Sequence, residues 1–323
     1  MTKRALVLGC TGQDGSFLTQ SLLNKNYDVY GISRSKNPDR RNHKVLDIEK
    51  KFKLSCVNLF DLEEVTEFIE DIHPNEIYNL TCQSSVGLSF VKPLTTLRSI
   101  VDITRNILES SRRLNFDGKL FFAGSGEVFG ETTIPATINS QKDPKSPYAV
   151  GKYESMLLVK LYRDCFGLKS KTGILFNHES FLRGKNFFTS KLISGAIECS
   201  LDKSKKLKLG NLSLYRDWGC AKEYVEAMQL VNNNPLSTDH IICTGVETSL
   251  QTIVEIVFSY FDLDWKNHVI IDKKLFRSSD VKRSCGNPEL LFNDLGWKST
   301  KNVEKIYESI IEFILGTKEV YKI

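Results

Sequence analysis

The chain has 323 residues, of which 41% are hydrophobic, and it carries a formal net charge of +5. This composition excludes a disordered protein, and no apolar stretch reaches the roughly 20 residues that a membrane-spanning helix needs. With no signal peptide, no Cys-x-x-Cys pair among the eight cysteines and only dispersed lysines, we expect a cytoplasmic protein without a metal site, disulfide framework, membrane attachment or nucleic-acid partner.

The first half of the chain alternates between short apolar runs and helical patterns. Strands are expected at 4–9, 27–32, 53–57, 76–80, 119–123 and 172–176, and helices at 17–23, 62–72, 103–114 and 148–165. Alternation of this kind predicts an α/β fold with a Rossmann-like, doubly wound parallel sheet. In such sheets, ligands bind at the carboxyl ends of the strands.

Beyond residue 176 the alternation breaks. A loop-rich stretch over 177–186 precedes an expected helix at 188–199, and short strands mixed with helices follow. We therefore predict a dinucleotide-binding domain over 1–176 and a smaller, mainly substrate-binding lobe over 177–323. Later segments near 217–245 are expected to return to the first domain.

The first strand leads directly into a glycine loop, Gly9-x-x-Gly12-x-x-Gly15. Glycines between a strand and a helix let backbone amides approach a pyrophosphate at the helix N-terminus. The second strand is followed by Ser-Arg-Ser-Lys at 33–36, where an acidic residue would bind a ribose 2′-hydroxyl. Arg34 suits a 2′-phosphate, so we expect NADP as the cofactor, with NAD as the alternative if Arg34 is only a solvated loop residue.

Tyr148 and Lys152 lie four residues apart on an expected helix and therefore share a face. The Lys152 ammonium is then expected to stabilise a Tyr148 phenolate and make it usable as a base near neutrality. Ser125 and Glu127 follow the preceding strand. The combination predicts a redox site with one additional acid/base group.

Six sequence runs, spread over nearly the whole chain, carry a family resemblance. They are GCTGQDGS at 9–16, YNLTCQSSVGLSF at 78–90, SPYAVGK at 146–152, GILFNHES at 173–180, LGNLSLYRDWGCAKEYVEAM at 209–228 and LGW at 295–297. They resemble the extended short-chain dehydrogenase/reductases. Within that group, they are similar to the GDP-mannose 4,6-dehydratases and their relatives acting on other GDP-sugars.

The resemblance implies two sets of binding residues. The cofactor set is Gly9, Thr11, Gly12, Gln13, Asp14, Gly15, Arg34, Asn58, Leu59, Leu80, Gln83, Ser84, Tyr148, Lys152, His178 and Arg183. The GDP-sugar set is Ser85, Asn177, Lys191, Arg216, Arg277 and Asp280. Asp280 stands where the family usually has glutamate, and Asn58 stands where an acidic residue is expected near the adenine, with Asp61 close by. His178 has an alternative reading as a satisfied structural histidine.

The implied activity is that of a lyase, a GDP-sugar 4,6-dehydratase that makes a 4-keto-6-deoxy sugar by internal hydride transfer through a tightly bound nicotinamide cofactor. The resemblance assigns Tyr148 to the 4-hydroxyl proton, Ser125 to a hydrogen bond with the 4-oxygen, and Glu127 to the C5 proton before water leaves from C6. A GDP-sugar 4-epimerase or 4-reductase, and a non-catalytic dinucleotide sensor, stay open as alternatives.

Several positions depart from the family pattern. Ser125-Gly126-Glu127 replaces Thr-Ser-Glu, which removes a hydroxyl often assigned to the C6 leaving group, and Ser85 replaces a histidine. We expect these smaller side chains to enlarge the sugar pocket, which favours GDP-N-acetylglucosamine, as in the branch leading to legionaminic acid, over GDP-mannose. Similar enzymes meet their neighbours through the Tyr-x-x-x-Lys helix and a basic loop, here 35–44. A homo-oligomer, either a dimer or a homotetramer, is therefore expected, with a flexible surface loop as the alternative for 35–44.

Overall fold

The computed structural model describes residues 2–277 and 279–317. Its main layer is a seven-stranded sheet in the order β10-β6-β5-β4-β1-β2-β3, and every neighbouring pair of strands is parallel. The strands are β1 (Arg4–Leu8), β2 (Asp28–Ser33), β3 (Lys53–Cys56), β4 (Glu76–Asn79), β5 (Lys119–Ser125), β6 (Lys169–Leu175) and β10 (His240–Ile242). The predicted doubly wound parallel sheet is confirmed.

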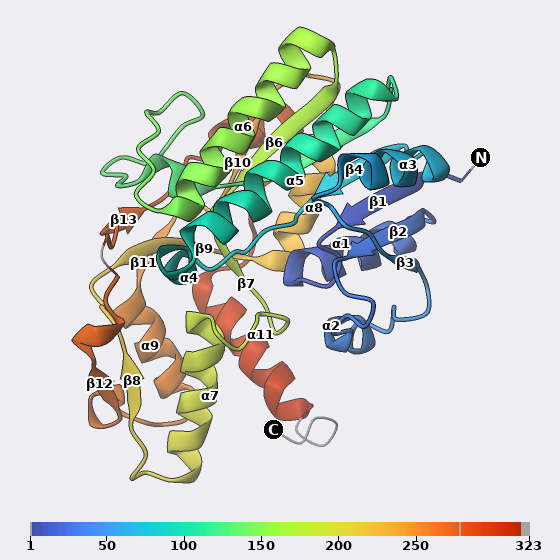
Figure 1. Ribbon diagram of the computed structural model, residues 1–323. Helices are drawn as coiled ribbons and strands as arrows, with labels where there is room; N and C mark the ends of the chain where they lie inside the picture. Colours follow the sequence, from blue (N-terminus) through green and yellow to red (C-terminus); the bar gives the residue numbers. More distant parts are fainter. Residues whose placement is uncertain (1, 278, 318–323) are drawn as a thin grey trace.

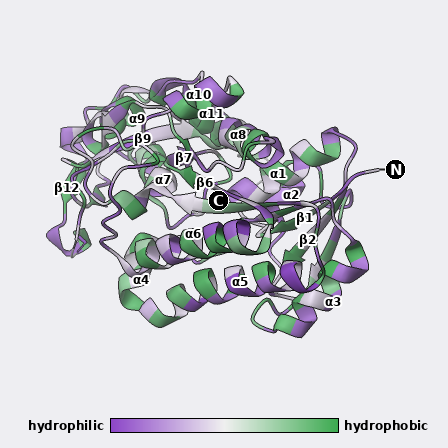
Figure 2. Ribbon diagram, turned by 90° about the horizontal axis from the view of Figure 1, so that it is seen from above, coloured by the Kyte–Doolittle hydropathy of each residue, from purple (hydrophilic) through white to green (hydrophobic). Residues whose placement is uncertain are grey.

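Helices cover both faces of this sheet (Figures 1 and 2). One face carries α3 (Leu62–Ile72), α5 (Pro93–Arg113) and α6 (Pro147–Phe166), and the other carries α1 (Gln13–Asn24), α8 (Ala221–Asn233) and α10 (Glu289–Leu295). The central strands β1, β4, β5 and β6 are buried on both faces, as is usual for parallel sheets, whereas the edge strand β3 is partly exposed. Two short helices, α2 (Arg41–Val45) and α4 (Val86–Val91), lie in connections at the carboxyl edge.

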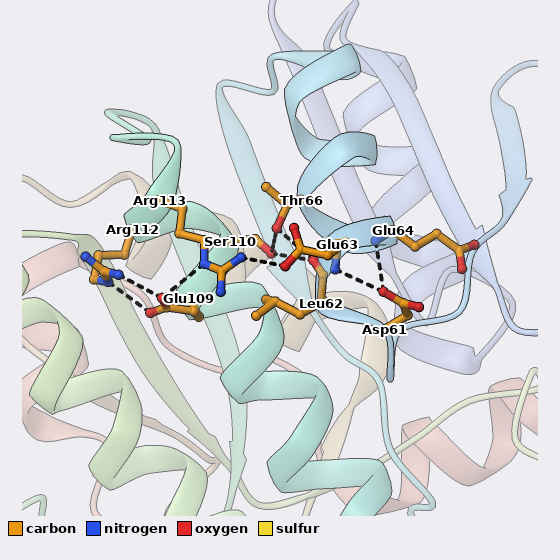
Figure 3. Close-up of polar contacts among 9 residues, drawn as sticks. All are labelled: Asp61, Leu62, Glu63, Glu64, Thr66, Glu109, Ser110, Arg112 and Arg113. Atoms are coloured by element: carbon orange, nitrogen blue, oxygen red, sulfur yellow. Dashed lines mark hydrogen bonds and ion pairs between the residues drawn. The ribbon is translucent and has the colours of Figure 1, made fainter.

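The helix starts follow ordinary capping chemistry. Ser146 accepts a hydrogen bond from the Ala149 amide at the start of α6, and Pro147 occupies the first helical position. Asp61 accepts from the amides of Glu63 and Glu64 at the start of α3, as Figure 3 shows. The Asp61 carboxylate is therefore occupied as a helix cap.

The remaining elements form a second assembly beside the sheet. Its strands are β7 (Asn177–Glu179), β9 (Tyr215–Cys220), β11 (Glu247–Ser249) and β13 (Arg283–Ser284), with a separate pair, β8 (Leu207–Leu209) and β12 (Val269–Ile271). Its helices are α7 (Phe188–Leu201), α9 (Leu250–Ser259) and α11 (Val303–Gly316), which pack around buried Trp218, Phe258 and Tyr307. By contrast, α8 packs against α1, and β10 pairs with β6. The domain boundary at residue 176 stays a prediction.

Three short 3-10 helices complete the described elements: η1 (Gly126–Phe129), η2 (Trp265–Asn267) and η3 (Lys273–Leu275). The first of these directly continues β5 and carries Glu127 at the carboxyl edge of the sheet. Within the described ranges, none of the helices combines the length and apolar character needed to cross a membrane.

Candidate active site

A cavity of about 1170 Å³ lies over the carboxyl ends of the central strands. Its walls come from the glycine loop, the segments that follow β2 to β6, the start of α6, strand β9 and the segment around residues 275–280. Every predicted site residue lines this cavity except Lys191, which is exposed on α7. The fold thus brings together residues spread over more than two hundred positions.

The glycine loop has a conformation that side chains would prevent. Gly9 has a φ of +83°, in the left-handed region, and a Cβ on Gly15 would lie 2.2 Å from the Gly9 carbonyl oxygen. Gly12 caps α1 without a side-chain hydrogen bond, so the first amides of this helix face the cavity free of a side-chain cap. Exposed amides at a helix start bind anions, and the geometry fits the pyrophosphate of a dinucleotide.

The end of the cavity that is lined by the segments after β2 and β3 is polar. It includes Glu64, a residue that the sequence pattern did not single out. Arg34 is exposed at the end of β2 and lines the wall, as do Asn58 and Glu64. Glu64 accepts a hydrogen bond of 2.9 Å from the Asn58 amide. Asp61 is engaged as the α3 cap (Figure 3) and does not line this wall, whereas the Glu64 carboxylate does. In the sequence, the Asp-x-x-Glu spacing of Asp61 and Glu64, which is typical of a helix N-terminus, was the signal that could have identified Glu64.

The basic segment 35–44 is partly fixed to the glycine loop of its own chain. Asn42 donates to the Thr11 carbonyl oxygen at 3.1 Å, and the buried His43 ring donates from Nε2 to the Cys10 carbonyl oxygen at 2.9 Å. Both residues lie in α2, so the second part of the segment is a helix packed beneath the loop. His43 had no sequence signal, because its role depends on burial.

Tyr148 and Lys152 occupy the first turns of α6, beside Ser125 at the end of β5. The Lys152 ammonium is buried and donates to the Ala123 carbonyl oxygen at 2.7 Å. Burial, followed by the nearby Cys82, raises the pKa of the Tyr148 hydroxyl well above its usual value, and the hydrogen bond with Ser125 only partly opposes this rise. Burial therefore opposes a phenolate near neutrality in the protein without its ligands, and the role of Tyr148 as a base stays a prediction.

Glu127 enters the cavity from η1, where its amide donates to the Ser125 hydroxyl at 3.3 Å. Beyond the larger effects of burial, its negative charge acts to raise the pKa of both Tyr148 and Arg216, and all three residues line the same cavity. Gly126, in contrast, does not line the cavity. A Cβ there would lie 2.9 Å from the ring of Phe176, which does line the cavity, so Gly126 affects the pocket only through this ring.

A buried ion pair joins the glycine loop to β7. The His178 ring donates from Nδ1 to the Phe176 carbonyl oxygen at 2.7 Å, and Nε2 lies 3.0 Å from an Asp14 carboxylate oxygen. Both partners are acceptors, so His178 is an imidazolium. Burial is the largest single influence and opposes ionisation of Asp14, but the charge and hydrogen bond of His178, together with Gln13 and Arg183, outweigh it and lower the pKa of this carboxyl to about 2.

The same contacts bear on the assigned cofactor role of His178. Both ring nitrogens are engaged within the protein, which favours the structural alternative for this side chain. Gln13 is similarly occupied, since its amide oxygen accepts from Ser180 at 2.8 Å. Arg183 lies 3.2 Å from the buried Glu179 carboxylate. These groups fix the loop to the second assembly, and Ser180 and Glu179 were not predicted as site residues.

Cationic side chains converge at the opposite end of the cavity. Arg216 is buried on β9, and Arg277 extends from an exposed segment. Burial lowers the pKa of Arg216, Glu127 raises it, and the charge of Arg277 lowers it further. Two like charges in one cavity repel each other, and a bound anion would relieve this repulsion. Asp280 accepts a hydrogen bond of 3.3 Å from the Arg277 amide.

Side chains in the loop after β4 also line the cavity, but they already form hydrogen bonds within the protein. The Gln83 amide donates to the Ser85 carbonyl oxygen at 2.9 Å and to Thr96 at 3.1 Å. Ser85 caps α4 by accepting from the Leu88 amide at 3.2 Å. Gln83 therefore shapes the loop on which Ser84 and Ser85 reach the cavity wall.

The fold and this cavity define a short-chain dehydrogenase/reductase of the extended type, with a dinucleotide end and a cationic end. Solved structures agree on the fold. The UDP-glucose 4-epimerase of Thermus thermophilus has a TM-score of 0.86 at 22% identity, covering 97% of this chain and 99% of that one. The dTDP-glucose 4,6-dehydratase of Bacillus anthracis has a TM-score of 0.86 at 18% identity, covering 99% of each.

Sequence comparison assigns the family. The model of the GDP-mannose 4,6-dehydratase family matches residues 6–310. GDP-mannose 4,6 dehydratase 1 of Arabidopsis thaliana is 37% identical over 321 residues, covering 96% of this chain and 89% of that protein. GDP-mannose 4,6-dehydratase of Sinorhizobium fredii is 33% identical over 347 residues, covering 98% and 99%. The chain belongs to the GDP-mannose 4,6-dehydratase family.

Proposed function

We propose that the protein is a GDP-sugar 4,6-dehydratase, a hydro-lyase that converts a GDP-hexose to the GDP-4-keto-6-deoxy sugar. The observation that carries this proposal is Glu127, a carboxylate in the same cavity as Ser125 and Tyr148. A 4-epimerase or 4-reductase needs no acid/base group at this position. Membership of the family, whose relatives carry the name GDP-mannose 4,6-dehydratase, supports the same conclusion.

The side chains divide the proton chemistry among them. A nicotinamide cofactor bound on the glycine loop supplies the reversible two-electron oxidation of the sugar. Tyr148 accepts the proton of the 4-hydroxyl group, and Ser125 donates a hydrogen bond to the 4-oxygen. Glu127 removes the C5 proton that the neighbouring ketone acidifies. Because position 126 is a glycine, Glu127 also returns a proton to the hydroxyl group that leaves C6.

The raised pKa of Tyr148 has a consequence for this sequence of steps. A buried phenol with a high pKa does not ionise in advance. Transfer of the 4-hydroxyl proton to Tyr148 therefore requires that the phenol proton first leave to solvent through the cavity. The hydrogen bond with Ser125 and the charge of Lys152, 5.8 Å from the ring centroid, stabilise the resulting phenolate.

The cationic end of the cavity suits the GDP portion. Arg216 and Arg277 are proposed to bind the diphosphate, which neutralises their mutual repulsion. Asp280 is proposed to accept hydrogen bonds from the guanine ring. At the other end, exposed Arg34 supports NADP rather than NAD, since a guanidinium there pairs with a 2′-phosphate.

The sugar unit is proposed to be mannose or N-acetylglucosamine. With Gly126 facing Phe176, the argument for the larger sugar now depends on Ser85, which does line the cavity. Restoring the family histidine with Ser85→His tests this point. If Ser85 makes room for an N-acetyl group, the variant loses turnover of GDP-N-acetylglucosamine by about tenfold relative to GDP-mannose. An unchanged ratio of the two turnover rates would reject the role of Ser85.

A homo-oligomer, a dimer or a tetramer, is proposed for the assembly. Helix α6 exposes Val150, Leu157 and Leu161, at 43%, 51% and 47% of their surface, along one face. Apolar residues at this spacing are typical of a helix that packs against another. Sedimentation of the wild type and of Leu157→Lys checks this assignment, because a charge in the interface would shift the protein toward the monomer.

The proposed activity is tested by proton NMR of GDP-mannose and GDP-N-acetylglucosamine, each incubated with the enzyme in deuterated water without added cofactor. We expect a new C6 methyl signal and deuterium at C5, and the preferred substrate identifies the sugar. Epimerised product without a methyl group would instead support a 4-epimerase. Loss of external NADPH in proportion to product would support a 4-reductase. Denaturing the purified protein and measuring the released dinucleotide distinguishes NADP from NAD.

A further inference from the structure

Two segments far apart in the sequence run side by side next to the cationic end of the cavity. One follows η1, and the other follows the segment that carries Arg277. The Thr132 amide donates to the Arg283 carbonyl oxygen at 3.0 Å, and the Cys285 amide donates to the Thr132 hydroxyl at 2.8 Å. The Ala136 amide in turn donates to the Cys285 carbonyl oxygen at 2.9 Å. The chain that leaves Glu127 is therefore paired with the chain that leaves Arg277.

Glu131 lies at the start of this pairing, at the end nearest the cavity. One of its carboxylate oxygens accepts from the Lys282 amide at 2.7 Å, and the other accepts from the Arg283 amide at 3.0 Å. A carboxylate that binds two successive amides forms two charge-assisted hydrogen bonds in a fixed geometry. Glu131 itself does not line the cavity. Its effect on a ligand passes through the backbone that it holds and, more weakly, through its charge, which is the smallest of the named influences on the pKa of Arg216.

That backbone restrains both cations of the cavity. Arg277 and Asp280 precede Lys282 in the chain, and the Lys282 carbonyl oxygen accepts a hydrogen bond of 2.8 Å from the Tyr215 amide. Strand β13 then continues along β9, with Ser284 paired to Arg216 (Figure 1). Because Arg216 and Arg277 repel each other, the exposed segment needs a fixed base to keep Arg277 over the cavity.

We propose that Glu131 is a positioning residue for the GDP portion of the substrate. By clamping the amides of Lys282 and Arg283, it holds the segment that carries Arg277 at a fixed distance from Glu127 and Arg216. This inference rests on the proposed function, because it assumes that a nucleoside diphosphate binds at the cationic end. Glu127, the proposed base, and Glu131, which holds the segment that carries Arg277, are only four residues apart in the chain.

A competing anchor is the ion pair between the side chains of Arg283 and Glu247 on β11. Both anchors lie at the surface, since 47% of the Arg283 side chain is accessible and Glu131 is exposed as well. The pair of Arg283 and Glu247 holds a side chain, whereas Glu131 holds two amides of the main chain itself. Glu131 is therefore the more direct restraint on the position of the segment.

The test is titration calorimetry of GDP with the holoenzyme, which does not depend on turnover. Glu131→Gln keeps the size of the side chain but turns an N–H group toward one of the two amides. We expect the dissociation constant for GDP to rise about fivefold or more, with unchanged cofactor content. In turnover assays, KM for the GDP-sugar rises more than kcat falls, because the reacting groups are untouched.

A matched control and a double variant separate positioning from general stability. Glu223 also binds main chain with its carboxylate, through the Thr300 amide at 3.3 Å, but it does not line the cavity. Glu223→Gln should lower the melting temperature without changing GDP affinity. If Glu131 acts through Arg277, then Glu131→Gln added to Arg277→Ala should weaken GDP binding by less than about twofold further.

Unchanged GDP affinity in Glu131→Gln overturns the inference, as do strictly additive losses in the double variant. A wild-type protein that binds GDP but turns over neither GDP-sugar would instead reject the proposed function. In that case, weakened GDP binding by Glu131→Gln would still support the positioning role.

Discussion

The two ends of the cavity are built on different principles. At the dinucleotide end, the wall is backbone, shaped by glycines and fixed from behind by buried groups such as His43, Asp14 and His178. At the cationic end, the wall consists of charged side chains, one of which, Arg277, extends from an exposed segment. A wall formed by backbone tolerates few amino-acid substitutions, whereas the binding properties of a wall formed by side chains change with each substitution.

This difference suits the two ligands. A cofactor that stays bound through every turnover favours a preformed site, because no ordering cost recurs. A substrate that must enter and leave favours a wall that can be held open or closed by a few contacts. Between the two ends lie Ser125, Glu127 and Tyr148, on β5, η1 and the first turn of α6, which belong to the rigid part.

The largest expected effect comes from the group between the two ends. Glu127→Gln should reduce formation of the 4-keto-6-deoxy product by about a thousandfold, since a general acid/base group typically contributes roughly 10²–10⁴ in rate. Binding of GDP and of the dinucleotide should stay within about twofold of the wild type, because the amide keeps the shape of the side chain. Product formation is measured by NMR of the C6 methyl group. Near-normal turnover would exclude Glu127 as the base.

A substitution in the glycine loop tests the backbone wall. Gly15→Ala would place a methyl group 2.2 Å from the Gly9 carbonyl oxygen, so the loop must shift. We expect a loss of about 3 kcal/mol in unfolding free energy and purification without bound dinucleotide. Gly87→Ala is the matched control, because its nearest atom, the Ser85 hydroxyl oxygen, lies at 4.0 Å. Both variants are compared by denaturant unfolding and by the dinucleotide released.

The same contrast explains what could be predicted from the sequence. Strand and helix patterns, together with the glycine spacing, identify the backbone wall and the order of the main sheet, since these depend on local periodicity. The short strands β7 and β13, of three and two residues, have no periodicity to detect. The extra residues at the start of α5 had a signal, Pro93 at the first helical position, that was overlooked.

Within the site, sequence motifs locate the residues but not their partners. Gly126 was expected to remove side-chain volume in or near the sugar pocket, and only the structure shows that the Phe176 ring lies between this position and the cavity. The direction of the Tyr148 pKa shift likewise depends on burial and on the nearby Cys82. Such properties arise from packing between distant segments, which no motif encodes.

The pH dependence of stability tests the pair that fixes the rigid end. Asp14 has a pKa lowered from 3.8 to about 2, so its contribution is present above 3.8 and is lost as the pH falls toward 2. His178 has a raised pKa, so its contribution is present below 6.5 and is lost as the pH rises through the higher folded value. Asp14→Asn should remove about 1 kcal/mol at a pH of about 5 and flatten both slopes. Denaturant unfolding across this whole pH range measures the effect. Identical pH profiles for the variant and the wild type would reject the ion pair.

A last pair of variants sharpens the comparison by contrasting the roles of two exposed cations, Arg34 and Arg277. Arg34→Ala should weaken NADP binding by about tenfold through the lost 2′-phosphate contact, while NAD and GDP bind as before. Arg277→Ala should weaken GDP binding by a similar factor and leave NADP unchanged. Calorimetric titration of each variant, stripped of dinucleotide, with each ligand gives the four affinities. If Arg34→Ala also weakened GDP binding, or Arg277→Ala also weakened NADP binding, the two ends would be energetically coupled. Clean separation would mean that each ligand is recognised by its own wall, with Glu127 as the group that both must reach.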